Sequence, residues 1–173
     1  MDDVFLGLGS NVGDRLRFLA GAVRALKQAP TLRVVKLSGI YRTEPVGVKD
    51  QPDFLNTVLG IQTSQDVHTL HSLVKSAEKE LGRREGARWG PREIDIDILM
   101  FGSLVVNERD LTVPHSEMNK RRFVLQPLAE IAPGAVHPLA RKKVAELLEE
   151  CGDANIVERS EELTQMYFSL LEE

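Results

Sequence analysis

The chain has 173 residues, of which 42% are apolar and 28% are charged, and these values fit one globular domain with a full core. Its formal net charge of −4 excludes a generally basic surface of the kind that holds nucleic acid or anionic lipid. No segment contains the roughly 18 apolar residues of a membrane span, and the start Met-Asp-Asp lacks the basic region of a signal peptide. A single cysteine, Cys151, cannot form an internal disulfide, so we expect a soluble, cytoplasmic protein.

Residues 1–63 predict one helix and three strands. Residues 4–8 predict a buried strand that enters a glycine-rich turn, after which leucine and valine recur at helical spacing until Pro30. Residues 33–42 and 54–63 predict two neighbouring strands. The connection between them, residues 43–53, is longer than the roughly 2–5 residues of usual hairpin loops, which indicates a binding loop or a disordered one.

Residues 64–173 predict further helices, one strand and an irregular loop. The regular elements are a helix over residues 67–82, a strand over 93–101, and helices near 120–130 and 140–151. The loop over residues 83–92 is too rich in glycine, proline and arginine to be regular. From residue 158 the acidic tail carries apolar residues at helical spacing.

The order β, α, β, β, α, β predicts the fold class. It is typical of an α+β fold, here a ferredoxin-like α/β sandwich with a mainly antiparallel sheet and flanking helices. We expect residues 1–157 to form the main domain. Residues 158–173 would form a C-terminal helical tail that packs on the same domain or contacts a partner.

Two aspartates alternate with isoleucines in residues 93–99, Glu-Ile-Asp-Ile-Asp-Ile-Leu. Because a strand repeats every two residues, the isoleucines face the core, and Asp95 and Asp97 project from the opposite face with Cα atoms about 7 Å apart. Magnesium prefers one or two carboxylates together with phosphate oxygens and waters. The alternative is an exposed strand face with two solvated aspartates, in which close like charges would repel without a cation.

Four arginines, Arg83, Arg84, Arg88 and Arg92, stand shortly before the aspartates in an otherwise acidic protein. Guanidinium groups bind phosphate oxygens in pairs and keep their charge, while a metal on the carboxylates would neutralise the other side of a triphosphate. A solvated basic loop is the alternative. The combination favours a magnesium–nucleotide site.

Other patterns argue against other kinds of site. The sequence has no GxxxxGK[ST] phosphate loop. The spacing of Gly7, Gly9 and Gly13 is one residue too long for a dinucleotide fingerprint. His68 and His71 lie one helical turn apart without a third ligand at metal-site spacing, so we interpret them as structural.

These motifs together resemble the family of 6-hydroxymethyl-7,8-dihydropterin pyrophosphokinases. The run over residues 88–99, Arg-Trp-Gly-Pro-Arg-Glu-Ile-Asp-Ile-Asp-Ile-Leu, is similar to their signature. Further matching motifs, which extend the resemblance over about residues 3–138, are Gly9-Ser10-Asn11, Tyr41-Arg42-Thr43, Gln51-Pro52-Asp53-Phe54-Leu55-Asn56, Leu111-Thr112-Val113-Pro114-His115 and Arg121-Arg122-Phe123.

The resemblance implies an ATP-dependent enzyme of folate biosynthesis. The β- and γ-phosphates of ATP would pass together to the hydroxymethyl group of the pterin, leaving AMP and the pterin diphosphate. Residues 1–157 would be the pyrophosphokinase domain. Asp95 and Asp97 would bind two Mg²⁺ ions, and the partners would be ATP and hydroxymethyldihydropterin, with no nucleic acid and no membrane, in a monomer.

The resemblance also implies roles for single residues. Catalytic contacts to phosphate would come from Arg83 and Arg92. The ATP site would comprise Glu78, Arg88, Arg92, Ile98, Thr112, His115 and Arg121. The pterin site would comprise Thr43, Val46, Phe54, Asn56, Trp89 and Phe123, with the two phenylalanines sandwiching the flat ring.

This chain departs from the best-known members at a few positions. Its arginine loop is one residue shorter, so Arg84 and Arg88 have no certain counterparts. Lys75 and Asp110 stand where those members carry glutamine and arginine. No residue stands out as a general base.

Two other classes of protein share parts of the pattern. Nucleotidyltransferases also join a Gly-Ser turn to an Asp-x-Asp strand, but here about 85 residues separate Ser10 from Asp95. A ferredoxin-like RNA-binding module would need exposed aromatic residues and a basic face, whereas only 5% of the residues are aromatic. The products separate the enzyme classes: AMP indicates a pyrophosphokinase, ADP an ordinary kinase and free pyrophosphate a nucleotidyltransferase.

Overall fold

The computed structural model describes residues 3–45, 50–84 and 90–173. The strands are β1 (Asp3–Ser10), β2 (Leu32–Leu37), β3 (Ile40–Thr43), β4 (Phe54–Thr63), β5 (Asp95–Phe101), β6 (Val106–Asn107), β7 (Thr112–Val113) and β8 (Val157–Ser160). The helices are α1 (Arg15–Lys27), α2 (Val67–Glu80), α3 (Arg122–Ile131), α4 (Val144–Glu150) and α5 (Glu161–Glu172), with a 3₁₀ turn at Met118–Lys120.

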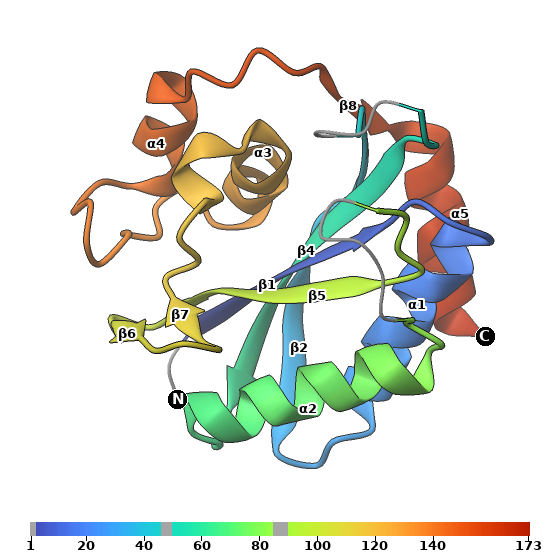
Figure 1. Cartoon of the computed structure of the whole chain (residues 1–173), viewed down its shortest axis with the longest axis horizontal. Helices are drawn as coiled ribbons and strands as arrows, with labels where there is room; N and C mark the ends of the chain where they lie inside the picture. The colour runs from blue at the N-terminus through green and yellow to red at the C-terminus, as the bar shows by residue number, and fades with distance from the viewer. Residues whose placement is uncertain (1–2, 46–49, 85–89) are drawn as a thin grey trace.

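A single antiparallel sheet runs through the centre of the molecule (Figure 1). Its strands follow the order β5-β1-β4-β3-β8, and β2 pairs with the other part of the long strand β4. The helices α1 and α2 thus each connect two strands that have a third, antiparallel strand between them. The predicted ferredoxin-like α+β sandwich is confirmed.

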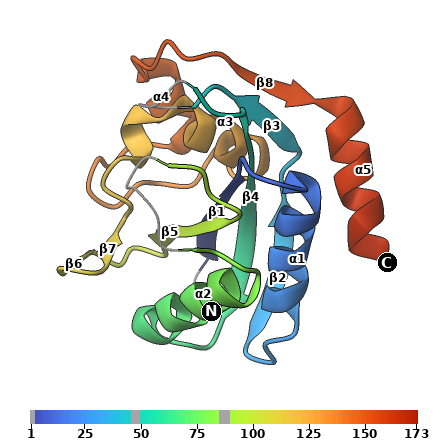
Figure 2. The same ribbon diagram turned by 45° about the vertical axis from the view of Figure 1, so that its right-hand side comes forward.

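Helices cover both faces of this sheet (Figures 1 and 2). Helices α1 and α2 cover one face, and α5 lies beside α1. Helices α3 and α4 cover part of the other face, where they pack on Phe5, Val58 and Leu99. Strand β1 serves both layers, because Leu6 and Leu8 face α1 and α2 while Phe5 faces α3.

The prediction of one strand over residues 33–42 is wrong, because the chain forms β2 and β3 with a break at Ser38 and Gly39. At the break, Ser38 hydrogen-bonds Val58 with its hydroxyl as well as its backbone: Oγ accepts from the Val58 N–H at 2.9 Å. The Gly39 N–H turns out of the sheet to donate to the Glu130 carboxylate at 3.1 Å. A serine side chain therefore replaces one backbone partner, and both short strands still pair with β4.

The C-terminal tail contains a strand that the sequence pattern did not predict. Strand β8 pairs with β3, and the helix then begins at Glu161, where the Ser160 hydroxyl accepts a hydrogen bond from the Leu163 N–H at 3.3 Å. Tyr167 is fully buried in the same core as α1. Helix α5 is held further by Arg24, whose Nη1 donates to the Leu170 carbonyl at 2.6 Å.

Candidate active site

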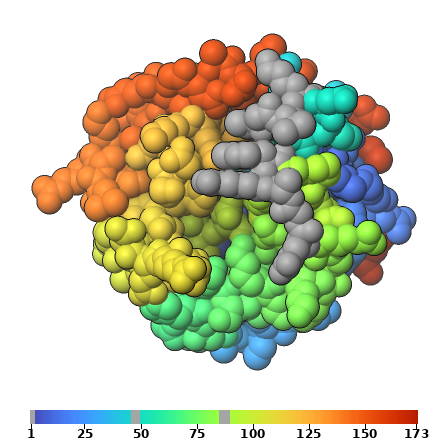
Figure 3. All heavy atoms as spheres, in the orientation of Figure 1, coloured from blue at the N-terminus to red at the C-terminus, as the bar shows by residue number. Residues whose placement is uncertain are grey.

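A pocket of about 340 Å³ opens over β1, on the face of the sheet that α3 covers in part. Figure 3 shows the molecule hollowed here, between the yellow segment that leads into α3 and the yellow-green strand β5. Many of the residues expected to bind ligands line it, namely Thr43, Phe54, Asn56, Arg92, Asp95, Asp97, His115, Arg121 and Phe123.

The pocket is deep over β1 because this strand carries glycine at Gly7 and Gly9, where a side chain would point into the pocket. Gly9 lies opposite Asp95 on β5 and opposite Asn56 on β4. A Cβ atom at Gly9 would lie 3.0 Å from Oδ1 of Asn56, and one at Gly7 would lie 3.2 Å from a methyl carbon of Leu99. The pocket therefore extends across β1, with carboxylates on one side and an amide on the other, about 10 Å apart at two strand spacings.

Asp95 and Asp97 face the pocket because the strand alternates. The intervening Ile96 is fully buried in the core on the opposite face. Both carboxylate oxygens of Asp95 have guanidinium partners, Arg83 Nη1 at 3.0 Å and Arg92 Nη1 at 3.0 Å. Asp97 lies beside His115, with 3.8 Å between Oδ2 and Nε2.

The electrostatic environment of Asp95 and Asp97 favours the binding of a cation. Burial and, after it, the neighbouring Asp95 carboxylate raise the pKa of Asp97, while His115 opposes the shift. Nδ1 of His115 accepts a hydrogen bond from the Glu117 N–H at 3.2 Å, so its proton belongs on Nε2, which faces Asp97. When the surroundings of a carboxylate disfavour its negative charge, a bound metal ion stabilises the ionised form by neutralising that charge.

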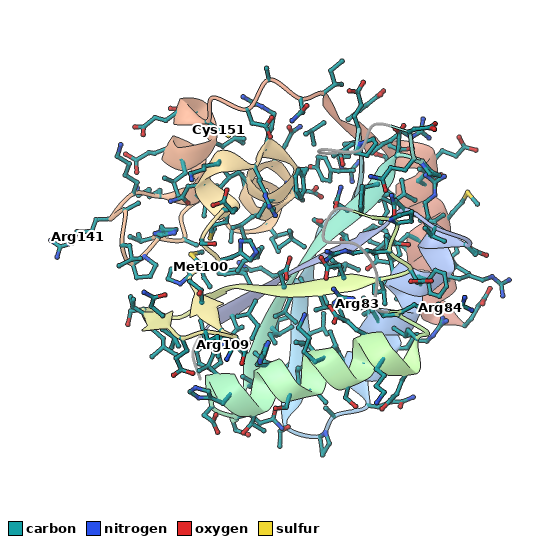
Figure 4. The ribbon with its side chains drawn as sticks, in the orientation of Figure 1. Arg83, Arg84, Met100, Arg109, Arg141 and Cys151 are labelled. Atoms are coloured by element: carbon teal, nitrogen blue, oxygen red, sulfur yellow. The ribbon has the colours of Figure 1, made fainter. Side chains whose placement is uncertain are left out.

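Glu78 forms a second layer behind the aspartates. It extends from α2, is 2% exposed, and accepts a hydrogen bond from the Ile96 N–H at 2.6 Å. Burial raises the pKa of Glu78, and Lys75, whose Nζ lies 3.1 Å away, opposes the shift. Nη1 of Arg83 contacts both Glu78 and Asp95, so this arginine bridges α2 and β5. Figure 4 labels Arg83 between these two elements. Burial would lower the pKa of Arg83, but the two carboxylates raise it.

The other end of the pocket is aromatic. Phe54 from β4 and Phe123 from the start of α3 are both partly exposed to it. The guanidinium carbon of Arg121 lies 5.7 Å from the centre of the Phe123 ring, a cation–π arrangement. Asn56 is buried, and its Nδ2 donates to Thr43 Oγ1 at 2.9 Å, which orients its amide.

Several of the expected residues lie elsewhere. The side chain of Ile98 is buried in the core between the sheet and helices α1 and α2, and Thr112 is exposed on β7. Arg84 is exposed to solvent, beyond Arg83 in Figure 4. Three of the residues expected to bind ligands lie outside the described part of the chain: Val46, Arg88 and Trp89.

Asn11 holds two loops in place through hydrogen bonds, a role that the sequence pattern did not predict. It is fully buried and exchanges two hydrogen bonds with the backbone of Arg92, at 2.8 and 3.1 Å. Its Nδ2 donates to Gln51 Oε1 at 2.9 Å and to the Pro52 carbonyl at 3.3 Å. The only signal was its place in a matching motif, because partners 40 and 81 residues away cannot be read from spacing.

Comparison with known proteins gives one family. The family model for 7,8-dihydro-6-hydroxymethylpterin-pyrophosphokinase (HPPK) matches residues 5–133. The chain is 43% identical over 150 residues to a 2-amino-4-hydroxy-6-hydroxymethyldihydropteridine pyrophosphokinase of Aquifex aeolicus, covering 87% of this chain and 92% of that one. It is 47% identical over 127 residues to the protein of the same name from Bacillus subtilis, covering 73% and 76%.

Solved structures share the fold. The wild-type HPPK-DHPS protein of Plasmodium falciparum aligns with a TM-score of 0.69 at 15% identity, over 86% of this chain. The aligned part is 44% of that protein, so this chain spans less than half of its length.

Proposed function

The chain belongs to the 7,8-dihydro-6-hydroxymethylpterin-pyrophosphokinase family, and on this premise we propose that the pocket over β1 is its active site. The enzyme transfers the pyrophosphoryl group of ATP to the hydroxymethyl group of 6-hydroxymethyl-7,8-dihydropterin, which gives AMP and the pterin diphosphate for folate synthesis. One observation carries the proposal: a single pocket is lined by paired carboxylates, arginines and two aromatic side chains.

Asp95 and Asp97 would hold two Mg²⁺ ions. The donor set fits, because two carboxylates on one strand face leave the remaining positions of each ion for phosphate oxygens and water. When bound, magnesium neutralises charge on the phosphates and favours their in-line displacement. Within the described ranges no cluster of three or more His, Cys, Asp or Glu residues suits a metal.

The phosphates would be bound by the guanidinium groups and the imidazole N–H that now lie near the carboxylates. Arg83 and Arg92 contact Asp95, and His115 and Arg121 line the same pocket. Arg88 belongs to this set by its place in the motif. Fixed donors around the phosphates stabilise the charge of the transition state and orient the reacting groups, without a covalent intermediate.

The pterin would lie between Phe54 and Phe123, where offset stacking suits a flat heteroaromatic ring. Asn56 would hydrogen-bond its amide-like edge, with Thr43 and Val46 offering backbone groups and Trp89 covering the site. Since Gly9 separates the amide from Asp95, the hydroxymethyl group would extend over the glycine toward the β-phosphate.

The nucleoside would lie along the free edge of β5, near Glu78, Ile98 and Thr112. In the described sheet β5 is an edge strand that pairs only with β1, so its outer backbone groups face α2 and β7. The buried side chain of Ile98 leaves its backbone as the part that could contact the base.

The ion count provides the test. In the presence of an unreactive ATP analogue, we expect the chain to bind two Mn²⁺ ions, counted by electron paramagnetic resonance. Asp95→Ala and Asp97→Ala should each lose at least one ion and lower kcat/KM by about a thousandfold or more. The exposed Glu80 on α2 gives a control, Glu80→Ala, with both values unchanged. Full activity in either aspartate variant would refute the metal assignment.

Other properties stay predictions from the sequence: a monomer, ATP and the pterin as the only partners, and a cytoplasmic location. Among the described residues, no helix has the length and apolar character needed to cross a membrane.

A further inference from the structure

Glu78 is a buried carboxylate with two cationic partners. Its side chain is 3% exposed and receives the Ile96 N–H at 2.6 Å. Lys75, one turn earlier on α2, places Nζ 3.1 Å from one carboxylate oxygen and 3.2 Å from the other. Arg83 Nη1 contacts the second oxygen. A buried carboxylate is unfavourable when it loses its partners, so the number of cations at Glu78 matters.

One nitrogen of Arg83 serves two carboxylates at once. Nη1 contacts Glu78 and also lies 3.0 Å from Oδ1 of Asp95. The other oxygen of Asp95 faces Nη1 of Arg92 at 3.0 Å. Both oxygens of Asp95 are therefore paired with guanidinium groups. If Asp95 holds a metal ion, Arg83 must leave Asp95, because the ion and the guanidinium repel each other. If the same Nη1 then binds phosphate, it also gives up its contact with Glu78.

We propose that Lys75 is a positioning residue for Arg83. Because Lys75 pairs with Glu78, Arg83 can leave Glu78 and bind the phosphates of the nucleotide. Lys75 stays on Glu78 when Arg83 turns away, so the buried carboxylate keeps a cationic partner throughout. This inference rests on the proposed function, in which Arg83 contacts phosphate.

The position of Lys75 suits this role. Its side chain is 41% exposed, and its Nζ also lies 3.4 Å from the Ile96 carbonyl. It thus holds the carboxylate and the start of β5 together from α2, without contacting either aspartate in the described part of the structure. Arg83 lies beyond the end of α2 at Glu80, and in the proposal its guanidinium changes partners while the contact between Lys75 and Glu78 persists.

The test compares Lys75→Met with a control on the same helix. Lys79→Met removes an equal charge from an exposed position that has no ion pair among the described residues. We expect Lys75→Met to bind a Mg²⁺-loaded, unreactive ATP analogue about tenfold more weakly by calorimetry, with kcat also lowered, since Arg83 then remains on Glu78. Lys79→Met should bind as the unmodified chain does, and Lys75→Arg should recover most of the affinity.

A double-variant cycle separates positioning from direct contact with ATP. In a Glu78→Gln background there is no buried charge to compensate, so Lys75→Met should cause no further loss. An undiminished loss in that background, or unchanged affinity in Lys75→Met alone, would overturn the proposal. Urea unfolding of each variant checks that it is folded, and Lys75→Gln replaces Lys75→Met if it is not. The proposed function fails separately, if the unmodified chain forms no AMP.

Discussion

Asp97 is less stable as an anion in the folded protein than in the unfolded chain. Burial and the Asp95 carboxylate both raise its pKa. The folded state therefore keeps the proton of Asp97 to higher pH than the unfolded state does. Stability contributed by this group is then lost as pH rises from about 4 through the raised pKa.

We predict that Asp97→Asn stabilises the metal-free protein while removing activity. Asparagine at position 97 removes the repulsion between the two carboxylates. The free energy of unfolding should rise by on the order of 1 kcal/mol or less, because Asp97 is 38% exposed and water screens its charge. Urea unfolding with EDTA, from pH 4 to pH 8, would measure it. The difference in the free energy of unfolding between Asp97→Asn and the unmodified chain should grow as the pH rises. A difference that shrinks with pH would mean that His115 and Arg121 dominate at Asp97.

At the scale of elements, Asn11 connects three segments, one of which carries the pocket residue Arg92. From the end of β1 it bonds the backbone of Arg92 before β5, and it reaches Gln51 and Pro52 before β4. Loops on both sides of the pocket are thereby fixed to one buried side chain. Arg92 owes part of its position beside Asp95 to this contact.

Asn11→Ala should destabilise the protein by about 1–3 kcal/mol, because the fully buried Asn11 side chain is lost and the Arg92 N–H loses its acceptor. It should also raise KM for ATP, since Arg92 is no longer held. The matched control is Asn107→Ala, at an exposed position on β6, with little effect on either quantity. Chemical denaturation and steady-state kinetics test both parts. A stable variant with normal KM would show that the loops keep their positions without Asn11.

The packing of helix α5 is relevant to the domain boundary that we expected between residues 157 and 158. We propose that residues 158–173 belong to the same domain, because Tyr167 is fully buried against it and Thr164 Oγ1 accepts the Ile40 N–H of β3 at 2.9 Å. Tyr167→Ala should lower the free energy of unfolding by about 3–5 kcal/mol. Met166→Ala, at a side chain that is 50% exposed, should cost less than about 1 kcal/mol. Equal effects of the two substitutions would indicate that α5 does not pack as a core element.

At the scale of the whole molecule, local patterns predicted the layers and the face that carries the site. Alternation in residues 94–98 was enough to direct Asp95 and Asp97 away from the core, because a strand has a fixed period of two. The order β, α, β, β, α, β was enough to predict the ferredoxin-like sandwich with its mainly antiparallel sheet.

What the sequence did not predict depends on contacts between distant residues. The break at Ser38 requires a hydrogen bond to Val58, and the edge strand β8 requires β3 as its neighbour. The same holds for Asn11, whose partners lie in two other loops. Spacing along the chain carries no information about such pairs, whereas a family motif records that a residue matters without giving its partner.

The central claim is that two phosphates move together in the pocket over β1. The most direct measurement uses ATP labelled at the β-phosphate, incubated with Mg²⁺, hydroxymethyldihydropterin and the unmodified chain. We predict that the label appears in the pterin diphosphate and that unlabelled AMP forms in equal amount. Labelled ADP, or free labelled pyrophosphate with AMP attached to the pterin, would contradict it.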